Sequence, residues 1–301
     1  MHEAASAPMT MPRVSVAIIA LDEEERIRAC LESVGWADEI VVVDSGSSDK
    51  TVAIAREFTD RVIFHAWEGY GAQKNFALAQ CHGDWVLSLD ADERVSDPLR
   101  EEIRVTLAAD PAAAGFRVPR QNFFQGAWVR HGGWYPDEQL RLFRRGRGAF
   151  TGSAVHESVR VDGPVARLAA PLVHQSYRGI ADFVARANRY SELAARELAT
   201  AGRGGSLADL LLRPGWRFVS MYLLRGGFLD GWRGFVLAVL YAHYVFLRAA
   251  KVREIGHNRP VTRRTPSTAA RDHGKRTPPP PGQRPKAVDG WGGAGGEGGP
   301  E

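Results

Sequence analysis

Short apolar runs that alternate with helical segments are the feature that most constrains how this chain can fold. Four runs rich in β-branched residues are separated by stretches whose apolar residues recur with helical spacing. They read VSVAIIAL from Val14, EIVVVD from Glu39, RVIFHA from Arg61 and DWVLSLDAD from Asp84. Strands that alternate with helices in this way predict a parallel α/β sheet with right-handed crossovers.

Capping signals support the predicted helices. Apolar residues with helical spacing occur in DEEERIRACLESV after the first strand and in GAQKNFALAQC after the third. Ser48 or Asp49 is the expected N-cap of a helix in DKTVAIAREF. Asp97 or Ser96 is expected to open a further helix, because Pro98 then occupies its first turn.

The rest of the chain departs from this alternation. Beyond residue 115, short strands and turns rich in Trp, His and Arg predict a mixed sheet with loops around a cleft. The Gly-rich segment AGRGGS then precedes an apolar, basic stretch. The predicted division is a flexible leader at 1–12, a domain at 13–200 with halves of about 13–110 and 111–200, a helical module at 207–255 and a Gly- and Pro-rich disordered tail at 257–301.

Composition limits the class of protein and its compartment. The 301 residues, 44% of them hydrophobic, suffice for one large or two smaller domains with a sizeable core. Two cysteines, Cys30 and Cys81, argue against a disulfide framework or a zinc site and fit a reducing compartment. The apolar run at 14–21 is too short for a signal peptide, so the cytoplasm is expected. No nucleic acid is expected as a partner, because the basic tail lacks interleaved aromatic residues.

Carboxylates crowd together where two of the predicted strands end. Asp44 ends the second strand, and Asp90, Asp92 and Glu93 follow the fourth. Ligands of parallel α/β sheets bind beyond the carboxyl ends of the strands, so these side chains are candidates for a binding site. An Asp-x-Asp pair suits Mg²⁺ or Mn²⁺, which completes its shell with waters and phosphate oxygens. The alternative is a strand-end cap followed by a solvated loop.

Glycine-rich phosphate loops are missing from the sequence. It contains neither G-x-x-x-x-G-K-[ST] nor G-x-G-x-x-G, so a bound nucleotide would depend on a metal ion to compensate its phosphate charge. Asp44 could accept the N–H of a uracil base, and Lys74 could assist a phosphate or the base edge.

Four ordered segments resemble the inverting glycosyltransferases of family 2, which have the GT-A fold. They are SVAIIALDEEERIRACLESV, EIVVVDSGSSDKTVAIA, GYGAQKNFAL and GDWVLSLDADE, and they lie within residues 13–105. GGWYPDEQLRLFRR, VHE and ANRYSELAA further resemble the branch that contains bacterial lipopolysaccharide-core β-1,4-glucosyltransferases. The resemblance implies a GT-A-type, Rossmann-like, mostly parallel sheet flanked by helices, followed here by a membrane-associating helical module.

The resemblance also implies roles for individual residues. Asp92 would ligate the metal ion with support from Asp90, and Asp137 lies where the family has its catalytic base. Many relatives have Glu-Asp there, whereas this chain has Asp137 followed by Glu138, so either residue could be the base. The uridine pocket would be lined by Ala17, Ile18, Ile19, Ala20 and Asp44.

Four further side chains each have two interpretations. Trp134 could stack on a sugar face or belong to the core of its loop. Arg141 could bind a phosphate or an anionic acceptor group, or lie on a solvated basic loop. His156 could ligate the metal ion or be a structural histidine, and His174 has the same alternatives.

The segment from 207 to 254 carries the information about membranes. Seven Lys and Arg against three Asp and Glu give it a charge of +4, as large as that of the whole chain. Its longest uncharged run, 234–247, is short for a bilayer span, which needs ~20 residues. Apolar stretches with interleaved Arg, Trp and Tyr predict helices that lie in the interface of an anionic membrane. A buried helical hairpin is the alternative.

These observations predict a metal-dependent inverting glycosyltransferase attached peripherally to the inner face of the plasma membrane. The expected donor is a UDP-sugar, UDP-glucose by the resemblance, and the expected acceptor is a glycolipid or lipid-linked saccharide such as lipopolysaccharide inner core. The nearest alternative is sugar transfer to a polyprenyl phosphate, which transmembrane helices after the catalytic domain would favour. A catalytically silent nucleotide-sugar-binding scaffold is a second alternative, against which the intact carboxylates argue.

Overall fold

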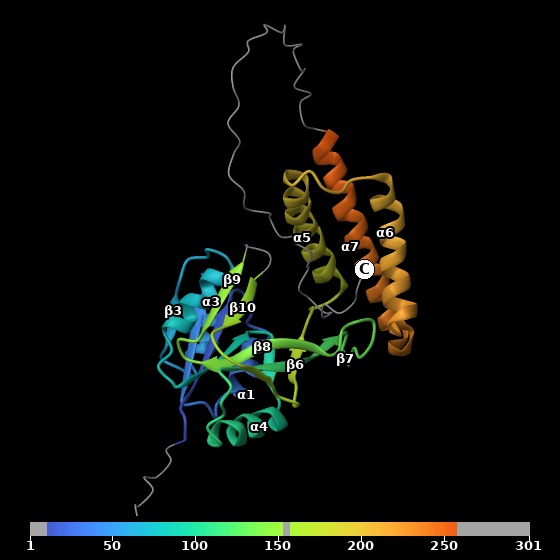
Figure 1. The fold of residues 1–301 in the computed structure, drawn as a ribbon. Helices are drawn as coiled ribbons and strands as arrows, with labels where there is room; N and C mark the ends of the chain where they lie inside the picture. Colours follow the sequence, from blue (N-terminus) through green and yellow to red (C-terminus); the bar gives the residue numbers. More distant parts are fainter. Residues whose placement is uncertain (1–10, 153–156, 258–301) are drawn as a thin grey trace, which may run out of the picture.

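The computed structural model describes residues 11–152 and 157–257 of the chain. Within this part, ten strands form one sheet and two form a separate ribbon (Figure 1). The strands are β1 Val14–Ala20, β2 Glu39–Asp44, β3 Val62–Phe64, β4 Trp85–Asp90, β5 Glu93–Val95, β6 Gly115–Phe124, β7 Ala127–Trp128, β8 Asp137–Arg144, β9 Gly148–Gly152, β10 Glu157–Val161, β11 Val165–Arg167 and β12 Leu172–Gln175. Most of the predicted leader, His156 and nearly all of the predicted tail lie outside the described residues.

The main path through the sheet has the order β3-β2-β1-β4-β8-β6-β12-β5. β1 pairs in parallel with β2 and β4, and β2 pairs in parallel with β3, so the predicted four-stranded parallel unit is confirmed. β8 is antiparallel to both β4 and β6, so the sheet becomes mixed beyond residue 115, as its irregular pattern predicts. The carboxyl end of β4 therefore lies beside the start of β8.

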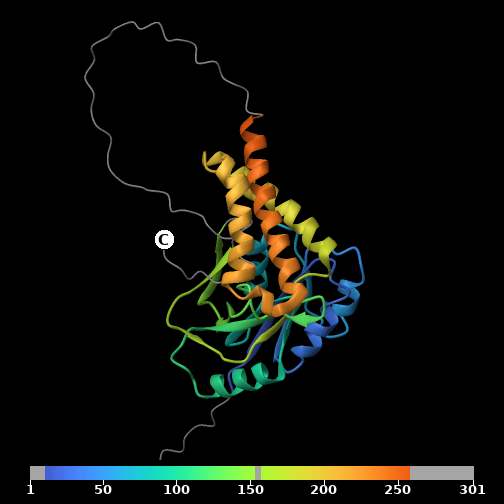
Figure 2. The same cartoon turned by 90° about the vertical axis from the view of Figure 1, so that its right-hand side faces the viewer.

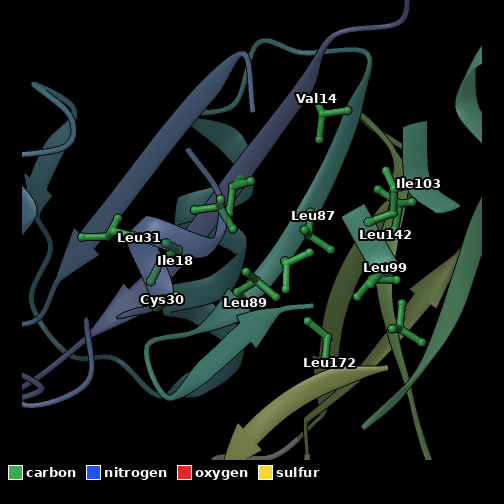
Figure 3. Packing of buried hydrophobic residues seen from close by; sticks show 14 of the residues in the cluster. Val14, Ile18, Cys30, Leu31, Leu87, Leu89, Leu99, Ile103, Leu142 and Leu172 are labelled. Atoms are coloured by element: carbon green, nitrogen blue, oxygen red, sulfur yellow. The ribbon is translucent and has the colours of Figure 1, made fainter. Parts of the chain in front are cut away.

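Helices cover both faces of the parallel strands. Leu31 of α1 and Leu99 of α4 pack on one face with Ile18 and Leu87 (Figure 3), and Ala77 of α3 packs on the other. Each of these side chains is at most 1% exposed, so buried apolar surface on both faces holds the strand ends in place. The helices are α1 Ile27–Ser33, α2 Thr51–Ala55, α3 Tyr70–Ala79, α4 Asp97–Ala108, α5 Ile180–Thr200, α6 Leu207–Val219, a π-helical turn η1 Ser220–Leu224, a 3₁₀ turn η2 Gly227–Asp230 and α7 Gly231–His257.

Helix capping follows the sequence prediction for α4 but not for α2. The Ser96 side chain accepts a hydrogen bond from the N–H of Leu99, which confirms Ser96 as the N-cap of α4. The residue before α2 is Lys50, whose side chain makes no capping bond. Asp49 instead accepts hydrogen bonds from the N–H and the hydroxyl of Thr51, so its carboxylate fixes the turn that follows β2.

α5, α6 and α7 form a helical layer, residues 180–257, beside the part of the sheet that carries β6 and β7 (Figures 1 and 2). Phe183 of α5 and Leu237 and Tyr241 of α7 pack with Phe124 of β6 and Trp134, which precedes β8. In contrast, none of the 13 residues of α6 is buried. The layer therefore has a packed inner side and an outer helix, α6, that packs against α7 without burying any of its own residues.

The helical stretch Gly227–His257 is long and apolar enough to cross a membrane, judged by length and composition alone. It is the one such stretch among the described residues, with a mean hydropathy of 1.5 in its apolar window. The uncharged run 234–247 is shorter than a span, but the helix continues beyond it at both ends, so the segment as a whole has a length that the run alone lacks. However, 39% of the same window is buried inside the protein, so part of the helix serves as core.

Candidate active site

A group of carboxylates lies at the edge where β4 ends and β8 begins. Asp90 is the last residue of β4, Asp92 lies in the turn that follows, and Glu93 is the first residue of β5. Asp137 is the first residue of β8, whose antiparallel pairing with β4 directs it toward the same edge.

Asp90 is bound by two cations of the protein. Nζ of Lys74 on α3 lies 2.8 Å from Oδ1 of Asp90, and Nη2 of Arg141 donates to Oδ2 at 2.6 Å. Burial by itself would raise the pKa of Asp90, but the charges of Lys74 and Arg141 outweigh it and hold the pKa well below its ordinary value. Asp90 therefore stays ionised, and each of its oxygens contacts a cation.

Glu93 and Arg120 extend this network to Asp137. The fully buried Glu93 accepts from Nη2 of Arg141 at 2.7 Å and from Nη1 of Arg120 at 3.3 Å. Arg120 also donates to Oδ2 of Asp137 through Nε at 2.8 Å and Nη2 at 2.5 Å, while Gln139 donates to Oδ1 at 2.6 Å. Burial raises the pKa of Asp137, but Arg120 and these hydrogen bonds lower it by more, so the net shift is downward.

Asp92 lies beside a histidine of β12. Nε2 of His174 lies 3.5 Å from Oδ2 of Asp92, and Nδ1 of His174 lies 2.6 Å from Oδ1 of Asn122. The Asn122 amide nitrogen donates to Oδ2 of Asp137 at 3.2 Å, so its carbonyl oxygen accepts and Nδ1 of His174 carries the proton. In its neutral form His174 thus presents the lone pair of Nε2 toward Asp92. Nη1 of Arg26 also contacts Asp92, at 3.3 Å.

The network shows how several acids can share one strand end. Each of the four carboxylates has an arginine or lysine within ion-pair distance. The cations are Arg26, Lys74, Arg120 and Arg141. Because a buried carboxylate without a counter-ion is costly, this pairing allows all four to remain charged at neutral pH. The sequence predicts that a metal ion compensates the negative charge of the whole group, but in the structure arginines and a lysine pair with all four carboxylates. Asp92 stays the candidate metal ligand, because it is the one of the four that also faces a histidine.

Asp92 and His174 are the donors that fit a divalent cation. Their facing atoms lie 3.5 Å apart, so both can reach one cation at about 2.1 Å. A carboxylate oxygen and a neutral imidazole suit Mn²⁺, and carboxylate and water oxygens suit Mg²⁺. Among the described residues there is no group of three His, Cys, Asp or Glu that could hold a metal ion, so water and ligand oxygens would complete the shell. Burial raises the pKa of Asp92, but the charges of a protonated His174 and of Arg26 lower it by more. When His174 is neutral and available as a ligand, Arg26 remains as the counter-ion of Asp92.

The two candidates for the catalytic base point to opposite faces of β8. Asp137 is only 4% exposed and binds Arg120 within the charged network. Glu138, the next residue, lies on the other face because side chains alternate along a strand. There its Oε2 lies 3.2 Å from Nε of Arg167 on β11. The geometry therefore favours Asp137, which shares the network with Asp92.

The four residues of β1 expected in a uridine pocket are all buried in the sheet. Ala17, Ile18, Ile19 and Ala20 are at most 9% exposed and lie between β2 and β4. Ile18 packs in the core beneath α1, whereas Ala17 and Ile19 belong to the core on the α3 side. All four side chains therefore cannot line one pocket. The prediction for Ile18 is wrong, because its side chain has no exposed surface.

Asp44 stabilises the turn that follows β2. Its Oδ2 accepts from the N–H of Gly46 at 2.8 Å and of Ser47 at 2.9 Å, and its Oδ1 accepts from the Ser47 hydroxyl at 2.5 Å. Gly46 has φ = 101°, a conformation that favours glycine. The glycine and the hydrogen bonds to Asp44 therefore both stabilise this turn. A carboxylate can accept about four hydrogen bonds, and Asp44 accepts these three. It could therefore still accept one from a uracil N–H, and this contact stays a prediction.

The predicted ligand contacts near the candidate base have different outcomes. The ring of Trp134 is 1% exposed and packs edge-on against Tyr241 of α7 at 6.0 Å, so the sugar-stacking prediction is wrong and Trp134 is a core residue. Arg141 is 4% exposed and bound to two carboxylates, so it does not lie on a solvated loop. Its Nε is buried and has no hydrogen-bond partner in the described part of the chain, so a phosphate contact stays a prediction. The role of His156 falls outside the described residues.

Sequence reasoning missed Arg120 and Asn122 and left His174 undecided. Arg120 and Asn122 lie on β6, and His174 pairs with Asn122 across β6 and β12. The available signal is spacing, because Arg120 and Asn122 stand at alternate positions of FRVPRQNFF, a segment that also contains the polar residues Arg117 and Gln121. Such alternation places both side chains on one face of the strand.

The chain matches the family model described as "Glycosyl transferase family 2" over residues 15–160. It is 35% identical over 246 residues to the lipopolysaccharide core biosynthesis glycosyltransferase LpsC of Rhizobium meliloti (strain 1021), covering 79% of this chain and 91% of that protein. The chain therefore belongs to glycosyl transferase family 2 and is a glycosyltransferase. Together with the mixed sheet, this confirms the predicted fold class.

Two further similarities have been found. The uncharacterized glycosyltransferase RT0209 of Rickettsia typhi is 33% identical over 257 residues, which cover 81% of this chain and 88% of that protein. Among solved structures, the mannosyltransferase PcManGT from Pyrobaculum calidifontis is similar with a TM-score of 0.48 and 19% identity, over 82% of this chain and 89% of that one.

Proposed function

We propose that this glycosyltransferase moves glucose from UDP-glucose, with inversion, onto a membrane-associated glycolipid such as lipopolysaccharide inner core. The similarity to a glycosyltransferase named for lipopolysaccharide core biosynthesis supports the acceptor class. The observation that carries the reaction type is the continuous set of contacts that joins Asp92, His174, Asn122 and Asp137 at one strand-end edge.

Asp92 and His174 would hold a divalent cation at this edge. When bound, Mg²⁺ or Mn²⁺ would supply Lewis-acid stabilisation of the diphosphate leaving group. Asp92 is suited to this role because its charge is preserved although it is largely buried. Lys74 and Arg141 would fix Asp90 behind it, and the unpartnered Nε of Arg141 is a donor for a ligand oxygen.

Asp137 would accept the proton of the acceptor hydroxyl. Its Oδ2 is occupied by Arg120 and Asn122, whereas Oδ1 accepts from Gln139 alone among the described residues. The lowered pKa keeps the carboxylate ionised but makes it a weak base. Proton transfer to Oδ1 would therefore accompany bond formation at the anomeric carbon rather than precede it.

Residues 13–200 would act as the catalytic unit, and residues 207–255 would attach it to the cytoplasmic face of the membrane. α6 supports this role because it has no buried residue and exposes Leu211, Leu212 and Trp216 by 64–69%. Large exposed apolar side chains next to arginines are typical of helices that lie in an anionic membrane interface.

Transfer to a polyprenyl phosphate is a second candidate function. The length and hydropathy of Gly227–His257 favour it, because a spanning helix would hold the enzyme beside a membrane-embedded carrier. The two functions differ in product, since a glycosyl polyprenyl phosphate releases its sugar in mild acid whereas an O-glycosidic glycolipid does not. Acid treatment of the labelled lipid product would distinguish them.

Calorimetric titration of UDP into the full chain tests the proposed function. We expect wild-type protein to bind UDP with Mn²⁺ and to lose this binding with EDTA. Asp92→Ala and His174→Ala should show no such metal-dependent binding of UDP. Binding that is equally strong in EDTA would remove the metal ion from the proposal. If UDP fails to bind while another nucleoside diphosphate binds, the donor assignment is wrong.

A further inference from the structure

A cavity of about 380 Å³ lies within the helical layer, and none of its lining residues belongs to the carboxylate network. Its lining comes from α6, η1 and α7 and comprises Arg213, Trp216, Arg217, Ser220, Arg225, Val245 and Arg248. Four of these seven residues are arginines. The volume is within the range of cavities that bind small ligands, about 300–1,000 Å³.

The positive charge in this cavity is poorly compensated by the protein. Nε of Arg213 pairs with Asp209 at 2.6 Å. Within residues 11–152 and 157–257, Arg217, Arg225 and Arg248 form no ion pair with a carboxylate. Arg248 lies beside the ring of Tyr244, 5.8 Å from its centroid. The cavity thus contrasts with the active-site edge, where every arginine meets an acid.

The uncompensated positive charge of the cavity affects the pKa of Arg217. Partial burial lowers the pKa of its guanidinium, and the like charges of Arg225 and Arg248 lower it further. Partly buried cations of like charge repel one another, and an anion between them would relieve the repulsion. Guanidinium groups bind phosphate bidentately, so phosphate is the anion whose geometry matches best.

Residues close in sequence to the arginines of the cavity have exposed apolar side chains. Trp216 lines the cavity and is itself 64% exposed, and Leu212, Leu223 and Leu224 are 53–69% exposed. Arg213 and Arg217 lie four residues apart and so share one side of α6, and Leu212 and Trp216, also four residues apart, share the adjoining side. Phosphate charge beside hydrocarbon is the chemistry of a lipid headgroup at a membrane surface.

The cavity is also connected to the loop that leads into Asp137. The carbonyl oxygen of Arg225 accepts a hydrogen bond from the N–H of Gly132 at 2.9 Å. The guanidinium of Arg225 lies against Gly133, where a Cβ atom would be 2.6 Å from Nη1, and the φ of 86° at Gly133 is a conformation that favours glycine. A ligand in the cavity would therefore lie next to the segment that positions the candidate base.

We propose that Arg217, Arg225 and Arg248 bind the phosphate of an anionic lipid headgroup. This inference rests on the proposed membrane attachment and gives it a specific site, in addition to the exposed apolar side chains. The lipid phosphate enters the cavity while Trp216 and the leucines of α6 and η1 contact the adjoining hydrocarbon. Binding is thus selective for anionic phosphate at a surface and depends on three identified arginines.

Co-sedimentation of the full chain with vesicles tests the proposal. Vesicles of phosphatidylcholine with phosphatidylglycerol should bind the protein more tightly than phosphatidylcholine alone. The double variant Arg217→Gln and Arg248→Gln should bind the anionic vesicles about 30-fold more weakly. The matched control is Arg203→Gln with Arg253→Gln, which removes the same charge from exposed positions outside the cavity and should stay within a few fold of wild type.

Equal losses in the two double variants would overturn the proposal, because diffuse charge would then explain binding. Tight binding of inorganic phosphate without binding to anionic vesicles would also overturn it, since the source would not be a lipid. The melting temperature of the cavity variant should not fall, because removing like charges relieves repulsion. If it does fall, Arg225→Gln at an exposed position provides the same test.

Titration of UDP into the same variants separates this inference from the proposed catalytic function. Lost vesicle binding with normal UDP binding in the cavity variant supports the lipid site. Wild-type protein that binds anionic vesicles through the cavity but never binds UDP would contradict the donor assignment alone.

Discussion

The strand-end edge of the sheet and the helical layer differ in whether their positively charged side chains are paired with carboxylates. At the edge, Lys74, Arg120 and Arg141 each lie within 3.3 Å of a carboxylate. In the described part of the helical layer, Arg217 and Arg225 have no such partner although they line one cavity. The first arrangement fixes side chains in place before any ligand arrives. The second leaves charge available for an external anion, so the comparison separates the proposed catalytic site, which is preorganised, from the proposed docking site.

The largest expected effect is that of Asp137→Asn on catalysis. Loss of the base should lower the rate of sugar transfer about 10²–10⁴-fold, since a positioned general base contributes about that much. UDP binding should remain, because Asp137 contacts Arg120, Asn122 and Gln139 and not the proposed metal ligands Asp92 and His174. The rate of glucose transfer at saturating donor, with calorimetry for UDP, measures both.

Glu138→Gln is the matched control for this prediction, because Glu138 is adjacent in sequence but lies on the opposite face beside Arg167. It should change the rate little. If Glu138→Gln stops transfer and Asp137→Asn does not, the assignment of the base moves by one residue.

Asp92→Ala should have the next largest effect. Transfer is expected to fall about 10²–10³-fold, because an electrostatic contribution to the leaving group is lost. Metal-dependent UDP binding should weaken in parallel, whereas vesicle binding by the helical layer should be unchanged. Unchanged turnover in this variant would remove Asp92 from the mechanism and with it half of the comparison.

Arg141→Met should mainly affect stability. It leaves the fully buried Glu93 and the partly exposed Asp90 with fewer counter-ions, and breaking a buried ion pair such as that of Glu93 costs about 3–5 kcal/mol. Arg147→Gln removes an exposed pair with Asp162 and should change the free energy of unfolding by no more than about 0.5 kcal/mol. Urea unfolding of both variants gives the comparison, and equal losses would show that the buried network is not special.

Leu224→Ser should weaken binding to anionic vesicles about tenfold without changing the melting temperature. Leu224 is 65% exposed in the helical layer, so little packing is lost in the folded protein. Val105→Ser on α4 is the control, since Val105 is 63% exposed but lies outside that layer. A melting temperature that falls only for Leu224→Ser would indicate protein packing rather than membrane contact.

Local pattern was enough to predict the parallel half of the sheet and its strand-end acids. The alternation of apolar strands and helices predicted β1 to β4, and the predicted strand ends lie within two residues of the observed ones. Asp90 and Asp92 could therefore be located before the structure was known. Their partners could not, because Lys74, Arg141 and His174 come from elements whose positions depend on tertiary packing.

Trp134 illustrates the limit most clearly. Its local context, a Gly-Gly turn before an acidic strand, is as compatible with a ligand contact as with a core position. It is buried because Tyr241, more than a hundred residues later, packs edge-on against it. Long-range contacts between an irregular loop and a distant helix leave no periodic signal in the sequence.

The smallest expected effect concerns the pH dependence of stability. Arg120 and its hydrogen bonds lower the pKa of Asp137 in the folded state, whereas its unfolded value is about 3.9. The contribution of Asp137 is therefore complete above that value and is lost as pH falls through the folded-state pKa. The arginines of the helical layer stay charged throughout this range and contribute no such slope. In urea unfolding between pH 6 and 3, the stability difference between wild type and Asp137→Asn should shrink as pH falls. The exposed Asp162→Asn should instead follow wild type in parallel, and a difference for Asp137→Asn that stays constant would contradict the role of the Arg120 pair.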